Sequence, residues 1–363
     1  MKKTIKLKYA ILPIVSIFLL SSVLIYSCTK SPSSVSLTTV AEDKQFITSS
    51  FNSTSACIND IVKGNGAQSL INFIKLSNGT TSNDDWINKM SDALDSIFPQ
   101  STKQDGTFDF AAYTGTYTWN HKTQTFSRKQ SNTISIEFPS DSTLSNNDIV
   151  ATFQSYTEKK YQVNSQDNYF PTSAVINITK NGSKIAGVNY SGTFSTGDFP
   201  TPQDISFSIN LAPYDYSIKV TQINSTQFQF TANLGCASVL NAKLTFNNSD
   251  YKNFNAKTYL DNIIFSYTKD NFIIKGNWDA KTFNGLNNPN TKDINTTLNL
   301  TVNNGSSKIG DLKFVDVAGG GRELFVVYKD GTTANTSIDY NPFLTNVKNI
   351  FRPYFGNGVD DWF

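Results

Sequence analysis

The stretch Gln227-Phe228-Gln229-Phe230-Thr231-Ala232-Asn233-Leu234 places apolar and polar side chains in strict alternation. A second stretch, Ile205-Ser206-Phe207-Ser208-Ile209-Asn210-Leu211, repeats this pattern. Successive side chains of a β-strand point to opposite faces, so each stretch predicts a strand with one buried and one solvated face. Similar alternation recurs from about residue 113 to about residue 338. Many such segments, joined by short turns, predict a large antiparallel sheet.

Turn motifs separate the alternating segments. The pairs Asn181-Gly182, Asn304-Gly305 and Asp330-Gly331 each lie between apolar runs. Such pairs favour tight hairpin turns, because glycine and asparagine tolerate the positive φ that these turns require. We therefore expect a β-dominated α+β fold in which residues 101–340 form an antiparallel meander, curved or folded on itself.

Before and after the predicted sheet, the apolar residues recur at the spacing of a helix instead of that of a strand. In residues 42–100 a helix is predicted from about Asp84 to Phe98, with weaker helices at 46–62 and 70–76. The predicted 84–98 helix has one apolar face, formed by Trp86, Ile87, Met90, Leu94, Ile97 and Phe98. Residues 341–363 hold a further predicted helix, which starts at Asn341-Pro342, and a tail. We expect these helices to pack on the sheet and residues 42–363 to form one domain.

The bulk composition limits the classes of partner. The chain has 363 residues, of which 13% are aromatic and only 17% are charged, and its formal charge is +2. Four lysines lie within residues 2–8, in a segment that we expect to be removed, which leaves 27 basic and 29 acidic residues. No basic run remains, so the composition argues against a nucleic-acid partner.

The N-terminus has the pattern of a secretory signal. The basic start is followed by an apolar stretch from Ile11 to Ile25 and then by Ser27-Cys28. This order of basic, apolar and small residues is typical of signal peptides, and the apolar stretch is shorter than the roughly 20 residues that span a bilayer. Residues 1–27 are therefore predicted to be a cleaved signal peptide.

The residues Ile25-Tyr26-Ser27-Cys28 resemble the lipobox of bacterial lipoproteins, and the Asn-, Lys- and Ser-rich body is similar to uncharacterised lipoproteins of the Bacteroidota type. The resemblance implies cleavage before Cys28, a diacylglycerol on its sulfur and an acyl chain such as palmitate on its amine. Residues 28–41 then form the lipidated cysteine and a flexible, Ser-rich tether. The first acidic residues after the cysteine are Glu42 and Asp43, whereas surface-exported members often carry an acidic tether. We therefore expect an outer-membrane anchor that faces the periplasm.

The other two cysteines, Cys57 and Cys236, have two interpretations. Export to an oxidising compartment would allow a disulfide between the helical region and the sheet. Two separately buried thiols are the simpler interpretation, because cysteine is a common small core residue and the spacing carries no geometry.

Catalytic and metal-binding signatures are missing from the sequence. The single histidine, His121, lies in a predicted turn, and no Gly-x-Ser-x-Gly nucleophile motif accompanies it. A zinc site would need several His or Cys ligands. We therefore expect no enzymatic activity, no cofactor and no bound metal.

The function expected from these observations is that of a lipid-anchored cell-envelope protein with a non-enzymatic binding or structural role. One alternative is a carrier that holds a lipid or other apolar ligand between the sheet and the helices. Another is a surface protein that binds glycans through exposed tyrosine and tryptophan side chains. An open apolar cavity would favour the carrier, and aromatic side chains on the polar face would favour the glycan-binding protein.

Overall fold

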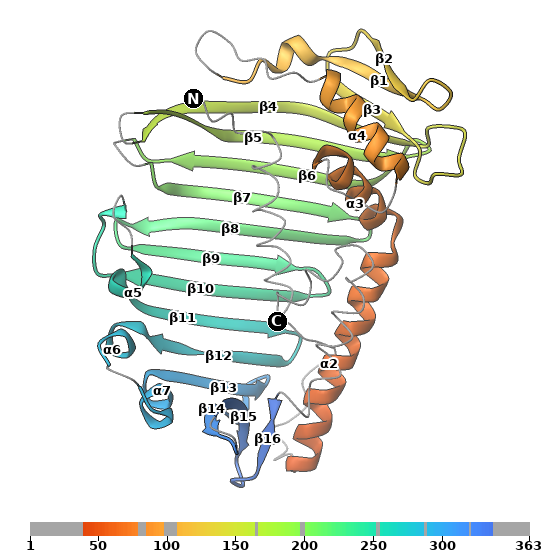
Figure 1. The fold of residues 1–363 in the computed structure, drawn as a ribbon. Coiled ribbons are helices and arrows are strands. Elements are labelled where there is room, and N and C mark those ends of the chain that lie inside the picture. The colour runs from red at the N-terminus through yellow and green to blue at the C-terminus, as the bar shows by residue number, and fades with distance from the viewer. Residues whose placement is uncertain are drawn as a thin grey trace. The chain divides into compact units, whose positions relative to one another are not determined.

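A computed structural model describes residues 39–78, 85–97, 107–163, 166–196, 200–251, 255–286, 289–318 and 321–336. Within these ranges sixteen strands form one hydrogen-bonded sheet in the order β16-β15-β14-β13-β12-β11-β10-β9-β8-β7-β6-β5-β4-β3-β1-β2 (Figure 1). From β3 to β16 each strand lies next to the strand that follows it in sequence. The β-dominated fold with a large meander sheet and N-terminal helices is therefore confirmed.

Contacts divide the described chain into two compact units. The first unit holds residues 61–216, and the second holds residues 39–60 and 217–336. Strand β8 (Tyr214–Asn224) contains the boundary between them. That residues 42–363 form a single domain stays a prediction, and each unit is described by itself.

The first unit contains two α-helices, a short 3-10 helix and seven complete strands within the described ranges. They are α3 (Asn65–Asn78), α4 (Asp85–Ile97), η2 (Phe110–Tyr113), β1 (Gly115–Asn120), β2 (Thr125–Lys129), β3 (Ile134–Phe138), β4 (Ile149–Val163), β5 (Gln166–Lys180), β6 (Ser183–Phe194) and β7 (Pro202–Leu211).

One strand pair of this unit departs from the predicted antiparallel meander. Strand β1 lies between β2 and β3, and it pairs with β3 in parallel, with Tyr117 opposite Ile136. Its other edge pairs with β2 in antiparallel fashion, with Trp119 opposite Phe126. Because β2 reverses the chain and β3 reverses it again, β3 must run in the same direction as β1. The sheet is therefore mixed, although most of it is antiparallel.

The predicted hairpin turns are confirmed at all three glycine positions. Between β5 and β6, Asn181 has a φ of 49° and Gly182 a φ of 79°. Gly305 and Gly331 have φ values of 56° and 84° in the turns after β13 and β15. A Cβ atom at any of these glycines would meet no atom within 4 Å. The positive φ, rather than lack of space, is therefore what favours glycine here.

The core of the first unit lies where α3 and α4 pack on one face of the sheet (Figure 1). The predicted 84–98 helix is observed as α4, and its Ile87, Met90 and Leu94 side chains are buried as the periodicity indicated. Asn83, Asp84 and Phe98 lie outside the described residues. The helices meet a patch of buried side chains from β1 and β3 to β6: Trp119, Ile136, Phe138, Ile149, Ala151, Ile176, Ile178 and Ala186.

Truncating Leu94 to alanine should destabilise the first unit by ~2–5 kcal/mol, because the side chain is only 8% exposed and lies within this core. Urea denaturation of Leu94→Ala against the parent measures the change. Lys89→Ala on the exposed side of the same helix is the control and should change stability by less than about 0.5 kcal/mol. Equal midpoints for Leu94→Ala and the parent would show that the α4 packing contributes nothing.

The second unit contains the larger part of α2 (Val40–Lys63). The other elements complete in the described ranges are α5 (Ala256–Tyr259), α6 (Ala280–Asn284), α7 (Thr291–Thr297), β9 (Gln227–Leu234), β10 (Ser238–Phe246), β11 (Leu260–Lys269), β12 (Phe272–Asp279), β13 (Leu298–Asn304), β14 (Ser307–Asp316), β15 (Arg322–Tyr328) and β16 (Thr333–Asn335).

Helix α2 begins six residues earlier than the hydrophobic period alone indicated, at Val40 instead of Phe46. Thr39 and Glu42 form a capping box: the Glu42 N–H donates to Thr39 Oγ1 over 3.3 Å, and the Thr39 N–H donates to Glu42 Oε2 over 2.7 Å. These bonds satisfy donors that a helix start leaves unpaired, and the hydrogen bond from the Thr39 backbone lowers the pKa of Glu42. The Thr-x-x-Glu spacing was the sequence signal for this boundary.

Four phenylalanines lie at the alternating apolar positions of their strands, but their burial differs. Phe207 and Phe228 are buried, whereas Phe230 and Phe265 are only half-buried. The odd or even position of a residue along a strand determines the sheet face on which its side chain lies, but it does not determine what covers that face. The alternation of Phe230 and Phe265 with polar residues thus identifies their face but does not imply full burial.

The predicted helix in residues 341–363 lies outside the described residues.

Candidate functional site

A disulfide joins Cys57 of α2 to Cys236 in the turn between β9 and β10, with the two Cα atoms 6.6 Å apart. The structure therefore replaces the simpler interpretation of two separate thiols with a bonded pair. Gly235, Cys236 and Ala237 have positive φ values of 73°, 50° and 57°, so the turn holds three consecutive residues with positive φ. This turn conformation presents the Cys236 sulfur to the helix.

Two further contacts tie α2 to the strand ends of the second unit (Figure 1). The Phe272 ring, at the start of β12, packs against Phe46 and Phe51 with centroid distances of 6.2 and 6.1 Å. Asp43, only 1% exposed, pairs with Lys329 after β15 over 3.2 Å. With the disulfide these contacts form what we call the α2 clamp, which fastens the helix to three separate strand ends.

The buried face of α2 beside the clamp is unusually polar. Between the buried Ile47 and Ile58 the helix buries Ser50 and Thr54, and the Thr54 hydroxyl donates to the Ser50 carbonyl over 3.4 Å. Buried hydroxyl groups contribute less than apolar side chains of the same size. The attachment of α2 therefore depends on its few strong contacts, and the disulfide is the covalent one.

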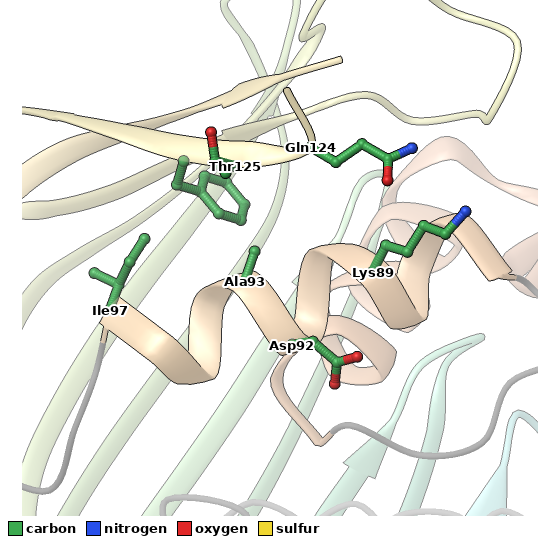
Figure 2. A pocket seen from close by; sticks show the side chains of 7 residues that line it. Lys89, Asp92, Ala93, Ile97, Gln124 and Thr125 are labelled. Atoms are coloured by element: carbon green, nitrogen blue, oxygen red, sulfur yellow. The ribbon is translucent and has the colours of Figure 1, made fainter. Parts of the chain in front are cut away.

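The first unit has a cavity of about 540 Å³ between α4 and the start of β2, shown in Figure 2. Ala93, Ile97 and Phe126 form its apolar part, and Phe126 in turn packs against Trp119 with ring centroids 5.1 Å apart. Its polar lining side chains are Lys89, Asp92, Gln124 and Thr125. The cavity, which we call the α4–β2 pocket, can therefore hold an apolar group and offer hydrogen bonds and charge beside it.

Strand β2, which borders the pocket, is the last strand at its end of the sheet and pairs with β1 alone among the described residues. Arg128 holds the far end of β2 in place: one guanidinium nitrogen donates to the carbonyls of Ala112 and Thr114 over 2.9 and 2.7 Å. The same guanidinium lies over the ring of Tyr117, at 5.7 Å. Burial raises the pKa of Tyr117, and the nearby positive charge opposes that rise. Both side chains thus position the strand.

The candidate residues from the sequence fall in different places. Cys28 lies outside the described residues. His121 occupies the turn between β1 and β2 as predicted, and its Nε2 lies 3.1 Å from the Asn147 side-chain oxygen. Asn147 also donates to the Trp119 carbonyl over 2.9 Å, so this contact holds the turn in place.

Several other titratable groups have structural partners. The carboxylate of Asp148 accepts the Ser140 N–H and hydroxyl, each over 2.7 Å. Glu158 accepts the Tyr156 hydroxyl over 2.7 Å and the N–H of Phe108. Burial is the main cause that raises the pKa of Tyr156, and the hydrogen bond to Glu158 adds to it. Of these hydrogen bonds only the one from Phe108 to Glu158 joins segments far apart in sequence, and the others hold local structure.

Within the described ranges no three His, Cys, Asp or Glu side chains gather closely enough to hold a metal ion. None of the helices in these ranges has the length and apolar character that crossing a membrane requires.

Comparisons with protein-family models, with curated proteins and with solved structures find no match to this chain. We therefore infer the function from the residues and their geometry.

The α4–β2 pocket had no recognised signal in the sequence. Lys89 and Asp92 read as the solvated face of a helix, and Gln124 reads as a turn residue. Gln124 adopts a positive φ of 53°, which the sequence pattern did not reveal. The pocket forms because α4 packs against β2, which lies well beyond it along the chain. Local periodicity carries no information on such a contact.

Proposed function

We propose that the chain is an exported, lipid-anchored envelope protein with a non-enzymatic binding or structural role, held at the outer membrane and facing the periplasm. The observation that carries this proposal is the disulfide between Cys57 and Cys236. Structural disulfides form and persist in oxidising compartments outside the cytosol. This agrees with the signal-like residues 1–27 and with the lipobox-like residues that end at Cys28.

The arrangement of the described residues supports a scaffold role. Between helices α3 and α4 and strands β3 to β6 the space is filled by side chains such as Phe73, Leu76 and Met90, all buried. A carrier of apolar ligands would need an open apolar cavity at such a place. The two most exposed large apolar side chains among the described residues are Ile223 and Ile264, so no tyrosine or tryptophan there stands out as a platform for glycans.

Mass spectrometry of protein purified from membranes tests the anchor. The mature N-terminus should be Cys28 with a diacylglycerol on its sulfur and an acyl chain on its amine. Several buried acyl chains, at about 0.8 kcal/mol per methylene, give stable attachment where a single chain gives only a reversible one. Cys28→Ser should release the protein from membranes or leave an unprocessed precursor.

Ser27→Ala provides the matched control, because it changes the neighbouring residue and leaves the sulfur in place; this variant should still be processed and acylated. A mature N-terminus at another residue, without lipid, would overturn the anchor. Protease treatment of intact cells tests the orientation: a protein that faces the periplasm is protected until the outer membrane is opened.

A further inference from the structure

We infer that the open edge of β2 and the adjoining α4–β2 pocket bind an extended peptide segment in which acidic residues alternate with apolar ones. The inference gives a partner class to the binding role proposed above and rests on that role. Three observations carry it: the position of β2 in the sheet, the lining of the pocket, and the charge around both.

Strand β2 offers backbone groups for pairing. Within the described residues it has a strand partner on one side only, and its five residues, Thr125–Lys129, are mostly exposed. An edge strand presents a row of N–H and C=O groups to which an extended chain can add as a further strand. The contacts of Arg128 with the carbonyls of Ala112 and Thr114 hold this strand in place before any partner arrives.

The pocket lies beside the same strand and can receive a side chain of the added peptide. Gln124, Thr125 and Phe126 contribute to the pocket from β2 and its turn, and Ala93 and Ile97 contribute from α4 (Figure 2). In peptide recognition of this kind, main-chain hydrogen bonds supply affinity and a pocket for alternate side chains supplies specificity. The apolar part of the lining suits a large apolar or aromatic side chain.

Charge selects an acidic partner. Pocket, turn and strand together carry four basic side chains and one acidic side chain, namely Lys89, Lys122, Arg128, Lys129 and Asp92. Basic residues on an edge strand also prevent pairing with a second copy, because two such edges would place like charges together. The same charges attract a strand with acidic residues, so the occupant is a different chain and not a second copy.

The probe is a fluorescein-labelled peptide of sequence Glu-Val-Glu-Phe-Glu-Val-Glu with blocked ends, and anisotropy with the full mature chain in detergent measures binding. We expect saturable binding that weakens as salt rises, and no binding of the same peptide with lysine at every glutamate. Two further peptides carry N-methyl groups on alternate amides, one set on each edge of the peptide strand. Only the set on the edge that faces β2 should lose binding, by about tenfold or more.

Two variants of α4 test the pocket. Ala93→Leu fills its apolar part and should weaken the phenylalanine peptide by about tenfold, with little effect on a peptide that has alanine in place of phenylalanine. Asp92→Asn, one residue away, replaces the carboxylate with a neutral amide of the same size, so it does not fill the pocket. This variant should bind the acidic peptide at least as tightly as the parent does. If Ala93→Leu does not fold, the comparison of the two N-methylated peptides on the parent chain still decides.

Equal binding of both N-methylated peptides would overturn the inference, because attraction of charges alone would then explain the result. Absence of any binding would also overturn it and would leave the basic residues of β2 with a purely protective role. Neither result depends on the lipid at Cys28, so failure here leaves the proposed anchor intact. If Cys28 carried no lipid and the peptide still bound normally, the proposed anchor would be overturned and the peptide-binding inference would stand.

Discussion

Replacing Cys57 and Cys236 together by serine should lower the free energy of unfolding by roughly 2–5 kcal/mol. The bond closes a loop with a sequence separation of 179 residues, and in the chain-entropy account a longer loop restricts the unfolded chain more strongly. The effect should therefore lie near the upper end of that range.

Guanidinium denaturation of the double variant, beside the parent with and without reductant, measures this change. The reduced parent should behave as the double variant does, since both lack the same bond. Hydrogen exchange on the double variant should show faster opening of α2 than of the strands it touches. A double variant with the stability of the oxidised parent would show that the other contacts of the clamp hold α2 without the bond.

Truncating Phe272 to alanine should cost ~3–5 kcal/mol, the range for a fully buried aromatic ring. The ring is 2% exposed and packs against Phe46, Phe51 and Tyr267, so the smaller side chain would leave a void between α2 and the strand ends. Interiors normally pack without such voids, and the neighbouring rings relax only in part. Chemical denaturation of the variant and the parent measures the loss.

Phe230→Ala is the matched control, because it makes the same change on a strand of the same unit. That ring is half-buried, so its removal should cost clearly less than the removal of Phe272. Similar losses for the two variants would mean that the difference in exposure does not decide the energetics. A larger loss for Phe230→Ala than for Phe272→Ala would contradict the prediction.

Local pattern was sufficient for many elements. The 3.6-residue period of Ile87, Met90 and Leu94 indicated both the existence of α4 and its buried face, and both are observed. Asn181-Gly182 indicated a hairpin because only a few residue types adopt positive φ readily, and the turn is found there. In each of these cases the deciding physics acts within a few residues along the chain.

Long-range features had no such signal. The parallel pairing of β1 with β3 depends on which edge of β1 the returning chain takes, and the alternation of β3 is the same on either edge. The disulfide was left open because two cysteines far apart in sequence meet only through the packing of α2. The α4–β2 pocket and the half-burial of Phe230 likewise depend on what lies opposite a face, and alternation only identifies the face.

The distance in sequence between the two bonded cysteines has a consequence for the order of events during biosynthesis. In the proposed export Cys57 emerges long before Cys236, so it must wait as a thiol while Cys28, a much nearer sulfur, is already present. A protein disulfide forms when a thiolate attacks a mixed disulfide that an oxidant has formed on the other cysteine, so a mixed disulfide formed early on Cys57 would be attacked by Cys28, and the wrong pair would be joined. A thioether to lipid at Cys28 would remove that competitor. Acylation would then do more than anchor the protein, because it would leave Cys57 a single partner for correct pairing.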